Sequence, residues 1–342
     1  MSKKKIIIFK NDAGGDLIHS REPIYNIIES NKDNEIILYL SERSEKFSFL
    51  FNAENLIIKR LNYHLTFFEK VVLFLYLIKE NITEVYILSP KNFYFYLPFI
   101  FRNVRFYGIC VHDINNYKRP NNFFRKYLYK SIINDRGALF KRPSTTALQN
   151  KLIGNLYKKK YQINFDYKNI NENLSNLKNY IYFHLKQQKF DKLGWSTNEL
   201  NSLFGEFLKY KKQVIFTRDI ETNNRNMDFY KIFNVFDFKN NKFINNSSNI
   251  ILIENAKGAD LYSIIKNADK VIAFHGMITS FAWIEEQPVL DLYLCEINKW
   301  DDYRKIRNSF YEFKPSYKNY DFIIPKKDFK KTINKMKFFL KK

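Results

Sequence analysis

The stretch KKIIIFKNDAGGD, from Lys4 to Asp16, decides the fold, and a second stretch, DKVIAFHGMITSFAWIEEQP, from Asp269 to Pro288, repeats its layout. In each, an apolar run typical of a buried strand ends in a tight glycine turn, and we expect a helix to follow. This layout directs backbone N–H groups and a helix N-terminus at an anionic ligand. Two such units predict two facing α/β domains, with a cleft between them for a phosphorylated small molecule and Asp16 on its rim.

The length of 342 residues is enough for two hydrophobic cores, and the 45% hydrophobic and 18% aromatic content indicates a globular chain. In the first half, the runs IIIF, EIILYL, EVYILS and NVRFYGICV alternate with helical patterns, such as one from about His19 to Ser30. Such alternation predicts a parallel sheet with crossover helices. We place one α/β domain at 1–165, a second at 176–325 and a basic C-terminal helix at 326–342.

The formal net charge of +22 has two interpretations. Lys, Asn, Ile, Phe and Tyr are enriched together, as in proteins from AT-rich genomes, so the charge is either a compositional effect on a solvated surface or a sign of a polyanionic partner, a membrane surface or an acidic glycan. The basic, aromatic segment from Asn115 to Ser144 is likewise either a solvated helix flank or the binding surface for an anionic acceptor, in which Lys118, Arg119 and Arg125 are the candidate contacts.

The two cysteines, Cys110 and Cys295, lie far apart in apolar runs, so we expect buried thiols, no disulfide and no metal site. The N-terminal MSKKK leads directly into a strand and lacks a signal-peptide core, which predicts a cytoplasmic protein. The longest apolar runs, Val71 to Ile78 and Phe93 to Phe101, are shorter than the roughly 20 residues that span a bilayer. They predict contact with a membrane surface at most, and we expect that surface to be the inner face of the cytoplasmic membrane.

Four stretches in order resemble the GT-B glycosyltransferases, and among them the family 9 group typified by lipopolysaccharide heptosyltransferases. The first has Lys10, Gly15 and Asp16 after a strand. The second is FHLKQQKFDKLGWSTNEL, the third runs from Thr217 to Glu221, and the fourth is NAKGADLYSIIKNADKVIAFHGM. The resemblance covers nearly the whole chain. It implies two facing Rossmann-like domains, of which the first, 1–165, binds the acceptor and the second, 176–325, binds a nucleotide-sugar donor. It also implies that the C-terminal helix packs back toward the N-terminal domain.

One departure from the family pattern concerns the donor sugar. The family usually has Asp-Thr-Gly followed closely by His, whereas this chain has Phe274-His275-Gly276 with Thr279 and Ser280, and one extra residue before Pro288. The resemblance implies ADP-heptose, but the altered turn leaves another nucleotide sugar open.

Inverting transfer to a hydroxyl needs a base and a way to stabilise the departing nucleoside diphosphate. Asp16 is our candidate base; the alternative is that it caps a helix starting near Leu17. Asp12 is the nearest competitor, and we expect it to be a turn residue. No cluster of metal ligands is evident, so we expect a metal-independent reaction without a cofactor, in which cations and N–H groups hold the diphosphate.

The candidate nucleotide-sugar contacts lie in the matching stretches of both domains. They are Lys10, Gly15, His184, Lys186, Lys189, Lys192, Thr217, Glu221, His275, Gly276, Met277 and Thr279. Any one of the lysines could instead be plain surface, and His275 could be structural. We expect Trp195 to pack its helix onto the sheet and Asp260 to cap a helix.

We therefore expect an inverting glycosyltransferase that uses a nucleotide sugar to build a surface glycan, such as lipopolysaccharide or capsule, on an anionic glycan or glycolipid acceptor. Two other classes remain open: a basic nucleic-acid-binding protein, and a non-catalytic scaffold at the membrane surface. The aromatic residues fall mostly in apolar runs rather than among arginines, which disfavours nucleic acid.

Overall fold

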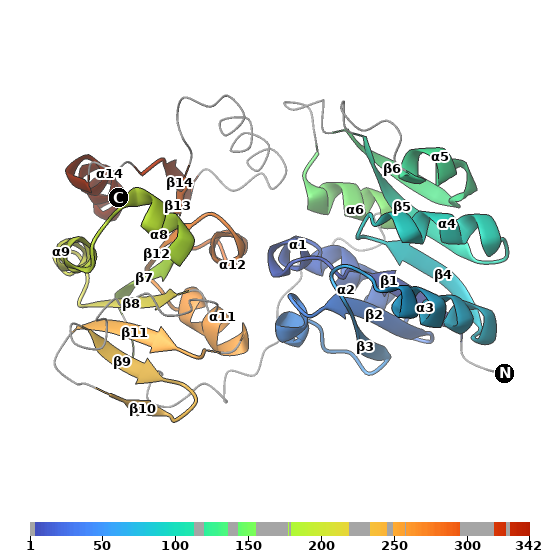
Figure 1. The fold of residues 1–342 in the computed structure, drawn as a ribbon, viewed down its shortest axis with the longest axis horizontal. Helices are drawn as coiled ribbons and strands as arrows, with labels where there is room; N and C mark the ends of the chain where they lie inside the picture. Colours follow the sequence, from blue (N-terminus) through green and yellow to red (C-terminus); the bar gives the residue numbers. More distant parts are fainter. Residues whose placement is uncertain are drawn as a thin grey trace. The chain divides into compact units, whose positions relative to one another are not determined.

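The computed structural model describes residues 4–112, 120–135, 143–154, 177, 179–218, 233–244, 249–256, 258–294, 318–325 and 329–342. The described residues divide into two compact units, one before residue 165 and one after residue 166 (Figure 1). Each unit has its own β-sheet and its own hydrophobic core.

The first unit contains a parallel sheet of six strands in the order β3-β2-β1-β4-β5-β6. The strands are β1 (Lys5–Phe9), β2 (Glu35–Ser41), β3 (Leu56–Leu61), β4 (Ile82–Ile87), β5 (Arg105–His112) and β6 (Lys130–Asp135). Ile7 on β1 and Ile37 on the neighbouring β2 are fully buried, as continuous apolar runs are in a sheet covered on both faces. The alternation in the sequence predicted β1, β2, β4 and β5. The strand β6 lies in the basic segment from Asn115 to Ser144, for which no strand was predicted.

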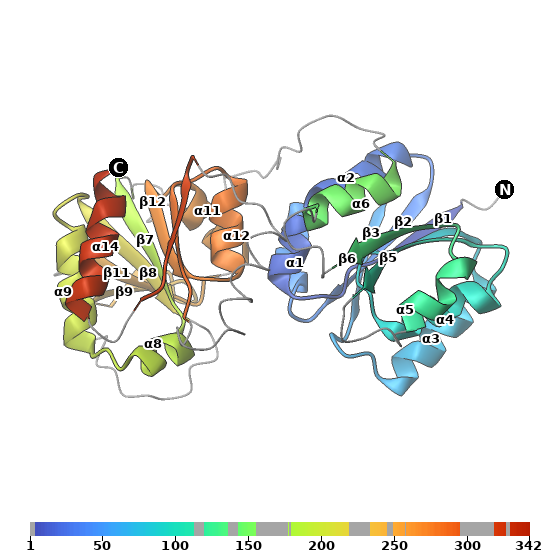
Figure 2. The same cartoon turned by 90° about the horizontal axis from the view of Figure 1, so that it is seen from above.

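Helices cover both faces of this sheet. They are α1 (Gly14–His19), α2 (Arg21–Ser30), η1 (Glu45–Leu50), α3 (Phe67–Lys79), α4 (Asn92–Ile100), α5 (Pro120–Phe124), η2 (Arg125–Tyr127) and α6 (Thr145–Ile153). Figure 2 shows α2 and α6 on one face and α3, α4 and α5 on the other. The predicted helix from His19 to Ser30 is α2 with the end of α1. Cys110 is buried in this core, and burial raises the pKa of its thiol to about 11.

The second unit contains an eight-stranded sheet in the order β10-β9-β11-β8-β7-β12-β13-β14. The strands are β7 (Tyr180–Leu185), β8 (Gln213–Arg218), β9 (Asn234–Asp237), β10 (Lys242–Phe243), β11 (Ile250–Glu254), β12 (Lys270–Phe274), β13 (Val289–Leu292) and β14 (Tyr320–Ile323). All neighbouring strands are parallel except β10, which pairs antiparallel with β9. Val235 and Phe236 of β9 are buried and pair with Leu252 and Ile253 of β11.

The helices of the second unit are α8 (Gln187–Leu193), α9 (Thr197–Phe207), α11 (Gly258–Lys266), α12 (Met277–Ile284) and α14 (Phe329–Lys341). A capping box starts α9, in which the Ser196 and Glu199 side chains each accept a hydrogen bond from the other residue's backbone N–H. Trp195 lies in the core, edge-on to Phe190 and Phe329, which confirms its packing role. Asp260 is the third residue of α11 rather than its cap.

The C-terminal helix packs into the core of the second unit, so the expectation that it packs back toward the N-terminal domain was wrong. Ile333, Met336 and Leu340 of α14 belong to that core, together with the buried face of α9. Lys270 on β12 donates hydrogen bonds to the carbonyl oxygens of Phe339, at 3.1 Å, and Leu340, at 2.7 Å. These are carbonyls of the last turn, which have no partner within a helix, so Lys270 fixes the end of α14 to its own sheet. No helix in the described ranges is both long and apolar enough to cross a bilayer.

Candidate functional site

In both sheets the strand order reverses beside the first strand of the unit, and this switch point determines where a ligand can bind. In the first unit, β2 and β3 extend to one side of β1, while β4, β5 and β6 extend to the other. In the second unit, β8 and β12 flank β7 in the same way. Successive crossovers diverge at such a point and leave a crevice beyond the carboxyl ends of the two strands, which is where open α/β sheets bind ligands. The residues after β1 and β4, and those after β7 and β12, are therefore the candidate sites.

In the second unit, this position brings together three residues that the sequence analysis selected. Lys186 follows β7, and His275 and Gly276 follow β12. The Lys186 ammonium donates a hydrogen bond of 2.5 Å to the His275 carbonyl oxygen. All three residues are partly buried. A lysine ammonium thus lies beside the N-terminus of α12, which starts at Met277, and both features favour an anion.

Gly276 has a backbone conformation that only glycine adopts readily, with φ +155° and ψ −150°. A Cβ at this position would also overlap the Lys186 ammonium. The Thr279 hydroxyl donates a 2.8 Å hydrogen bond to the Gly276 carbonyl and lies 3.2 Å from its nitrogen, and Thr279 is buried. Thr279 therefore stabilises the turn from its buried side. Gly276 and Met277 are partly buried, so their backbone N–H groups are the ones that a ligand could reach.

The His275 ring is held in a fixed orientation by groups that the sequence analysis did not select. Its Nδ1 lies 2.7 Å from Oδ2 of Asp291, a buried carboxylate on β13, and the ring stacks on Tyr293 with centroids 4.4 Å apart. Tyr320 donates a 2.9 Å hydrogen bond to the same Asp291 oxygen. Burial, reinforced by the Asp291 carboxylate, raises the pKa of both tyrosines, so they stay neutral donors. With Nδ1 engaged, Nε2 is the nitrogen through which His275 can meet a ligand.

His184 and Thr217 lie one residue before the carboxyl ends of β7 and β8, and their side chains are buried. His184 Nδ1 lies 2.8 Å from the Thr217 hydroxyl, which also lies 2.5 Å from the Tyr182 hydroxyl, and all three side chains are buried. These contacts join the carboxyl ends of β7 and β8, and the role of both residues in nucleotide-sugar binding stays a prediction. On α8, Lys189 is partly buried and Lys192 is exposed.

Three other predicted residues, Lys118, Arg119 and Glu221, lie outside the described residues. Arg125 is exposed on η2 and donates a hydrogen bond of 3.0 Å to the Ser131 hydroxyl.

In the first unit, Asp16 lies in the first turn of α1, two residues after Gly14, and Gly15 precedes it. Ala13 occupies the N-cap position, so the alternative in which Asp16 caps the helix was wrong. Asp16 and Gly15 are partly buried. A carboxylate at this position faces the positive end of the helix dipole.

Lys10 and Asp12 form an ion pair of 2.9 Å at the end of β1, in which the Lys10 side chain is 3% exposed. Burial alone would raise the pKa of Asp12, but the adjacent Lys10 ammonium outweighs it and lowers that pKa. Lys10 therefore has a fixed carboxylate partner in its own unit, which the sequence did not reveal. Asp12 is a turn residue, as expected, and it is also the counterion of Lys10.

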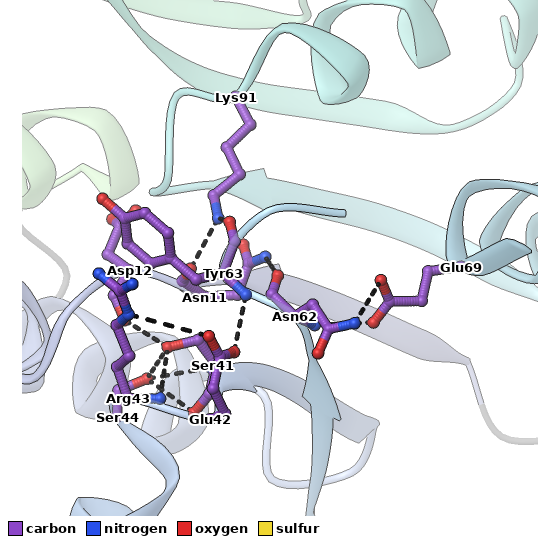
Figure 3. Close-up of polar contacts among 10 residues, drawn as sticks. All are labelled: Asn11, Asp12, Ser41, Glu42, Arg43, Ser44, Asn62, Tyr63, Glu69 and Lys91. Carbon is purple, nitrogen blue, oxygen red and sulfur yellow. Dashed lines mark hydrogen bonds and ion pairs between the residues drawn. The ribbon is translucent and has the colours of Figure 1, made fainter. Parts of the chain in front are cut away.

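Figure 3 shows how the loop after β1 is attached to its neighbours. Lys91, after β4, donates a 2.8 Å hydrogen bond to the Asn11 carbonyl and another to the Tyr63 carbonyl. Asn11 donates to the Asn62 carbonyl at 3.0 Å. The Ser41 hydroxyl, at the end of β2, donates to the Asp12 carbonyl at 2.6 Å. These bonds attach the loop after β1 to the carboxyl ends of β2, β3 and β4.

A pocket of about 410 Å³ opens above this loop. It is lined by Asp12, Tyr63, His64, Leu65, Lys70, Pro90, Lys91, Asn92 and Phe93. Burial lowers the pKa of Lys91, whose ammonium also lies 4.5 Å from the centre of the Tyr63 ring. Two ammonium groups, a histidine and two aromatic rings suit a polar ring compound that carries an anionic group. The sequence analysis missed this pocket because its residues come from loops after three different strands.

No group of three or more His, Cys, Asp or Glu side chains in the described part of the chain is arranged to bind a metal ion. The chemistry that the described sites offer is therefore that of ammonium groups, backbone N–H groups, an oriented histidine and the Asp16 carboxylate.

Two Rossmann-like units in one chain, each with its crevice at the switch point of the sheet, define the GT-B architecture. The structure of Escherichia coli heptosyltransferase WaaC with ADP-2-deoxy-2-fluoro heptose is similar, with a TM-score of 0.60 and 12% identity over 98% of this chain and 99% of that one. The glycosyltransferase of family 9 from Veillonella parvula gives a TM-score of 0.58 and 12% identity over 98% and 89%. The chain thus has the fold of the family 9 heptosyltransferases.

The same fold also occurs in a second class of enzyme. The UDP-GlcNAc 2-epimerase of Methanocaldococcus jannaschii gives a TM-score of 0.56 and 14% identity over 100% of this chain and 93% of that one. No protein-family model matches the chain, and its sequence matches no curated protein.

Proposed function

We propose that this chain is a glycosyltransferase that binds a nucleotide sugar in its second unit. The observation that carries the proposal is the contact between Lys186 and His275 at the switch point between β7 and β12, beside the N-terminus of α12. An ammonium group, helix N–H groups and an oriented imidazole suit the two phosphates of a nucleoside diphosphate. The solved structures of the same fold support this assignment, because one of them is a heptosyltransferase with an ADP-linked heptose analogue.

The donor that we propose is an ADP-linked heptose or a related nucleotide sugar. His275 and Gly276 stand where the family pattern has Thr and Gly, and His275 is fixed by the buried Asp291. An imidazole is larger than a threonine side chain and can donate to a phosphate or a sugar hydroxyl through Nε2. The altered turn therefore supports a change in the sugar rather than a loss of the site.

The reaction that we propose is inverting and metal-independent, with Asp16 as the base. A carboxylate on the first turn of α1 can accept the proton of an acceptor hydroxyl as that oxygen attacks the anomeric carbon. The departing diphosphate would be neutralised by Lys186 and by the N-terminus of α12, which can take the place of a divalent cation. Lys10 does not join this role in our proposal, because Asp12 already neutralises it.

The acceptor that we propose is an anionic glycan or glycolipid. The pocket of the first unit supports this, since Lys70 and Lys91 line it together with Tyr63 and Phe93. Sugar rings pack on aromatic side chains, and a carboxylate or phosphate on the sugar would pair with the ammonium groups. Arg125, with Lys118 and Arg119, remains a proposed contact for the more distant part of the acceptor. Nucleotide sugars are made in the cytoplasm, where we place the reaction.

The experiment that tests the proposal is a thermal-shift panel of ADP, UDP, GDP, CMP and dTDP, each with magnesium and with EDTA. A ligand that binds the native state raises the apparent stability by mass action. Stabilisation by ADP in EDTA supports the proposed donor, and stabilisation by another nucleotide keeps the class but changes the donor. Incubation with the matching nucleotide sugar then separates the classes by product: released nucleotide with an acceptor indicates transfer, and an epimerised nucleotide sugar indicates the epimerase class. No response to any nucleotide would leave the scaffold or nucleic-acid alternatives.

A further inference from the structure

Helices α3, α4 and α5 of the first unit expose large apolar side chains to solvent. Phe67 and Phe68, at the start of α3, are 82% and 74% exposed. The exposed set continues along all three helices through Val72, Leu75, Phe99, Ile100 and Phe123. We call this set the α3–α5 surface. Scattered exposed apolar residues are normal, but a contiguous patch of this kind marks an interaction site.

Helix α3 is apolar on both of its sides. Leu73 and Leu77 face the core and are buried, whereas Phe68, Val72 and Leu75 face outward at spacings of four and three residues. A helix at the surface of a water-soluble domain normally carries polar residues on its outer stripe. We therefore expect the exposed apolar stripe of α3 to contact an apolar partner outside the first unit.

Ring contacts make the three helices one continuous surface. Phe74 on α3 meets Phe101, next to the end of α4, with ring centroids 5.2 Å apart. Phe99 on α4 meets Phe124 on α5 at 6.0 Å and Tyr127 on η2 at 5.2 Å. Figure 2 shows α3, α4 and α5 along the same face of the sheet.

Cations lie among the exposed rings of this surface. The Arg102 guanidinium lies 4.3 Å from the centre of the Tyr127 ring and 5.2 Å from that of Phe99. The Lys126 ammonium lies 5.6 Å from the centre of the Phe123 ring. Helices α3, α4, α5 and η2 contain one acidic residue, Glu69, and its carboxylate is bound in the capping box at the start of α3. The surface is thus apolar, aromatic and basic.

We propose that the α3–α5 surface docks onto a bilayer that contains anionic lipid. Aromatic rings and long cationic side chains together suit the boundary between acyl chains and headgroups, where rings enter and cations meet phosphates. A second copy of the chain fits less well, because a symmetric interface would gather Arg102 and Lys126 of both copies in one contact area, where the four helices supply only Glu69 as an acidic residue. In an anionic bilayer the apolar stripe can contact the acyl chains, and Arg102 and Lys126 can contact the phosphates of the headgroups.

The α3–α5 surface borders the pocket of the first unit. Lys70 belongs to α3 and also lines the pocket, and Phe93 of α4 lines it as well. A chain docked through α3 and α4 would hold this pocket beside the lipid headgroups. Docking explains how the chain reaches a substrate attached to lipid, and it does not depend on which reaction the protein performs.

The test is cosedimentation of the full chain with vesicles of phosphatidylcholine alone or mixed with phosphatidylglycerol. We expect binding only to the anionic vesicles, and weaker binding at high salt. Phe68→Ser with Leu75→Gln removes apolar groups without touching the core, and we expect about a tenfold weaker partition. Arg102→Gln with Lys126→Gln should lower the partition by a similar factor and remove most of the salt dependence.

The matched control is Phe338→Ser on the basic helix α14, where Phe338 is 65% exposed. We expect this control to bind vesicles like the unchanged chain. A depth measurement adds a second readout: Phe68→Trp should show tryptophan quenching by brominated acyl chains. Nucleotide-induced thermal shifts should be equal in all variants, which separates this proposal from the proposed function.

Three outcomes would overturn docking through this surface. The first is no binding of the unchanged chain to anionic vesicles. The second is a loss of vesicle binding in Phe338→Ser as large as that in the Phe68→Ser, Leu75→Gln variant. Binding would then depend on the basic and apolar character of the whole chain and not on the α3–α5 surface. The third is a dimer, seen by size-exclusion chromatography with light scattering, that Phe68→Ser dissociates while vesicle binding is absent; the surface would then be a self-association interface.

Discussion

The ammonium of Lys186 lies 2.5 Å from the carbonyl oxygen of His275, and this contact joins the ends of β7 and β12 across the switch point of the second sheet. A carbonyl oxygen carries only a partial negative charge, so a phosphate is a stronger partner for the same ammonium. The contact holds the lysine where a diphosphate at the N-terminus of α12 would meet it.

We predict that Lys186→Met weakens nucleotide binding about 10-fold to 100-fold, because a hydrogen bond to a charged group contributes about 1.5–3 kcal/mol. Calorimetric titration with the nucleotide selected by the thermal-shift panel measures the change. Lys212→Met is the matched control, because Lys212 is exposed and precedes the amino end of β8, and we expect its affinity to stay within about twofold. Equal losses in both variants would mean that overall charge, not this contact, attracts the nucleotide.

We predict that Gly276→Ala destabilises the second unit and lowers nucleotide affinity. The conformation at Gly276 costs a residue with a side chain about 1–3 kcal/mol, and the new Cβ also displaces the Lys186 ammonium. The shift of the urea unfolding midpoint measures the first effect, and calorimetry measures the second.

Gly205→Ala is the control for that substitution within the same unit. Gly205 lies inside α9, and a Cβ there would meet nothing within 4 Å. Alanine in a helix interior is favoured over glycine by about 0.5–1 kcal/mol, so this variant should be more stable than the unchanged chain. If Gly276→Ala were also as stable as the unchanged chain, the turn after β12 would not be constrained as described.

We predict that Asp12→Asn destabilises the first unit in a pH-dependent way. The substitution leaves the Lys10 ammonium buried without its counterion, which costs about 3–5 kcal/mol. Because the pKa of Asp12 is lowered below the ordinary value of 3.8, its contribution to stability is complete above that value and is lost as the pH falls through the lower native value. The difference between the two chains should therefore be constant from neutral pH to about pH 5 and shrink below about pH 4.

Urea unfolding at several pH values measures this difference, with the exposed Asp33→Asn as the control. We expect Asp33→Asn to follow the unchanged chain at every pH. A stability gap for Asp12→Asn that does not change with acid would show that the ion pair contributes nothing specific.

The strands and turns that place the second-unit site could be predicted from sequence because they are local. An apolar run, a glycine and a helical pattern follow each other directly around Gly276, and parallel strands bring such turns to the same edge of the sheet. Lys186 could be placed beside that turn for the same reason. Its partner atom could not, because the contact depends on the order of the strands.

Contacts between residues far apart in the sequence could not be predicted from the sequence alone. Asp291 could have been noticed as a lone carboxylate in the apolar run PVLDLYL, but nothing local indicates that it orients His275 or that Tyr320 completes the group. The pocket of the first unit is built from loops after β1, β3 and β4. The position of α14 was predicted wrongly because its apolar stripe suits any apolar face, and the face that it meets is that of α9.

The last prediction concerns Asp16, which we propose as the base. Asp16→Asn should lower the transfer rate about 10²-fold to 10⁴-fold, since asparagine cannot accept the proton. Nucleotide affinity should stay within about twofold, because the proposed nucleotide contacts belong to the other unit. Steady-state rates with the nucleotide sugar and acceptor, together with calorimetry, measure both quantities.

The urea unfolding midpoint of Asp16→Asn separates a loss of catalysis from a loss of folding. Ala13, and not Asp16, holds the N-cap position of α1, and a carboxylate in the first turn contributes about 0.3–1 kcal/mol through the helix dipole, so we expect a small change in the midpoint. A variant that unfolds early would instead indicate that Asp16 is structural. A stable variant with an unchanged rate would move the search for the base to another carboxylate, and Asp12 is the nearest, although its bond to Lys10 and lowered pKa make it a poor proton acceptor.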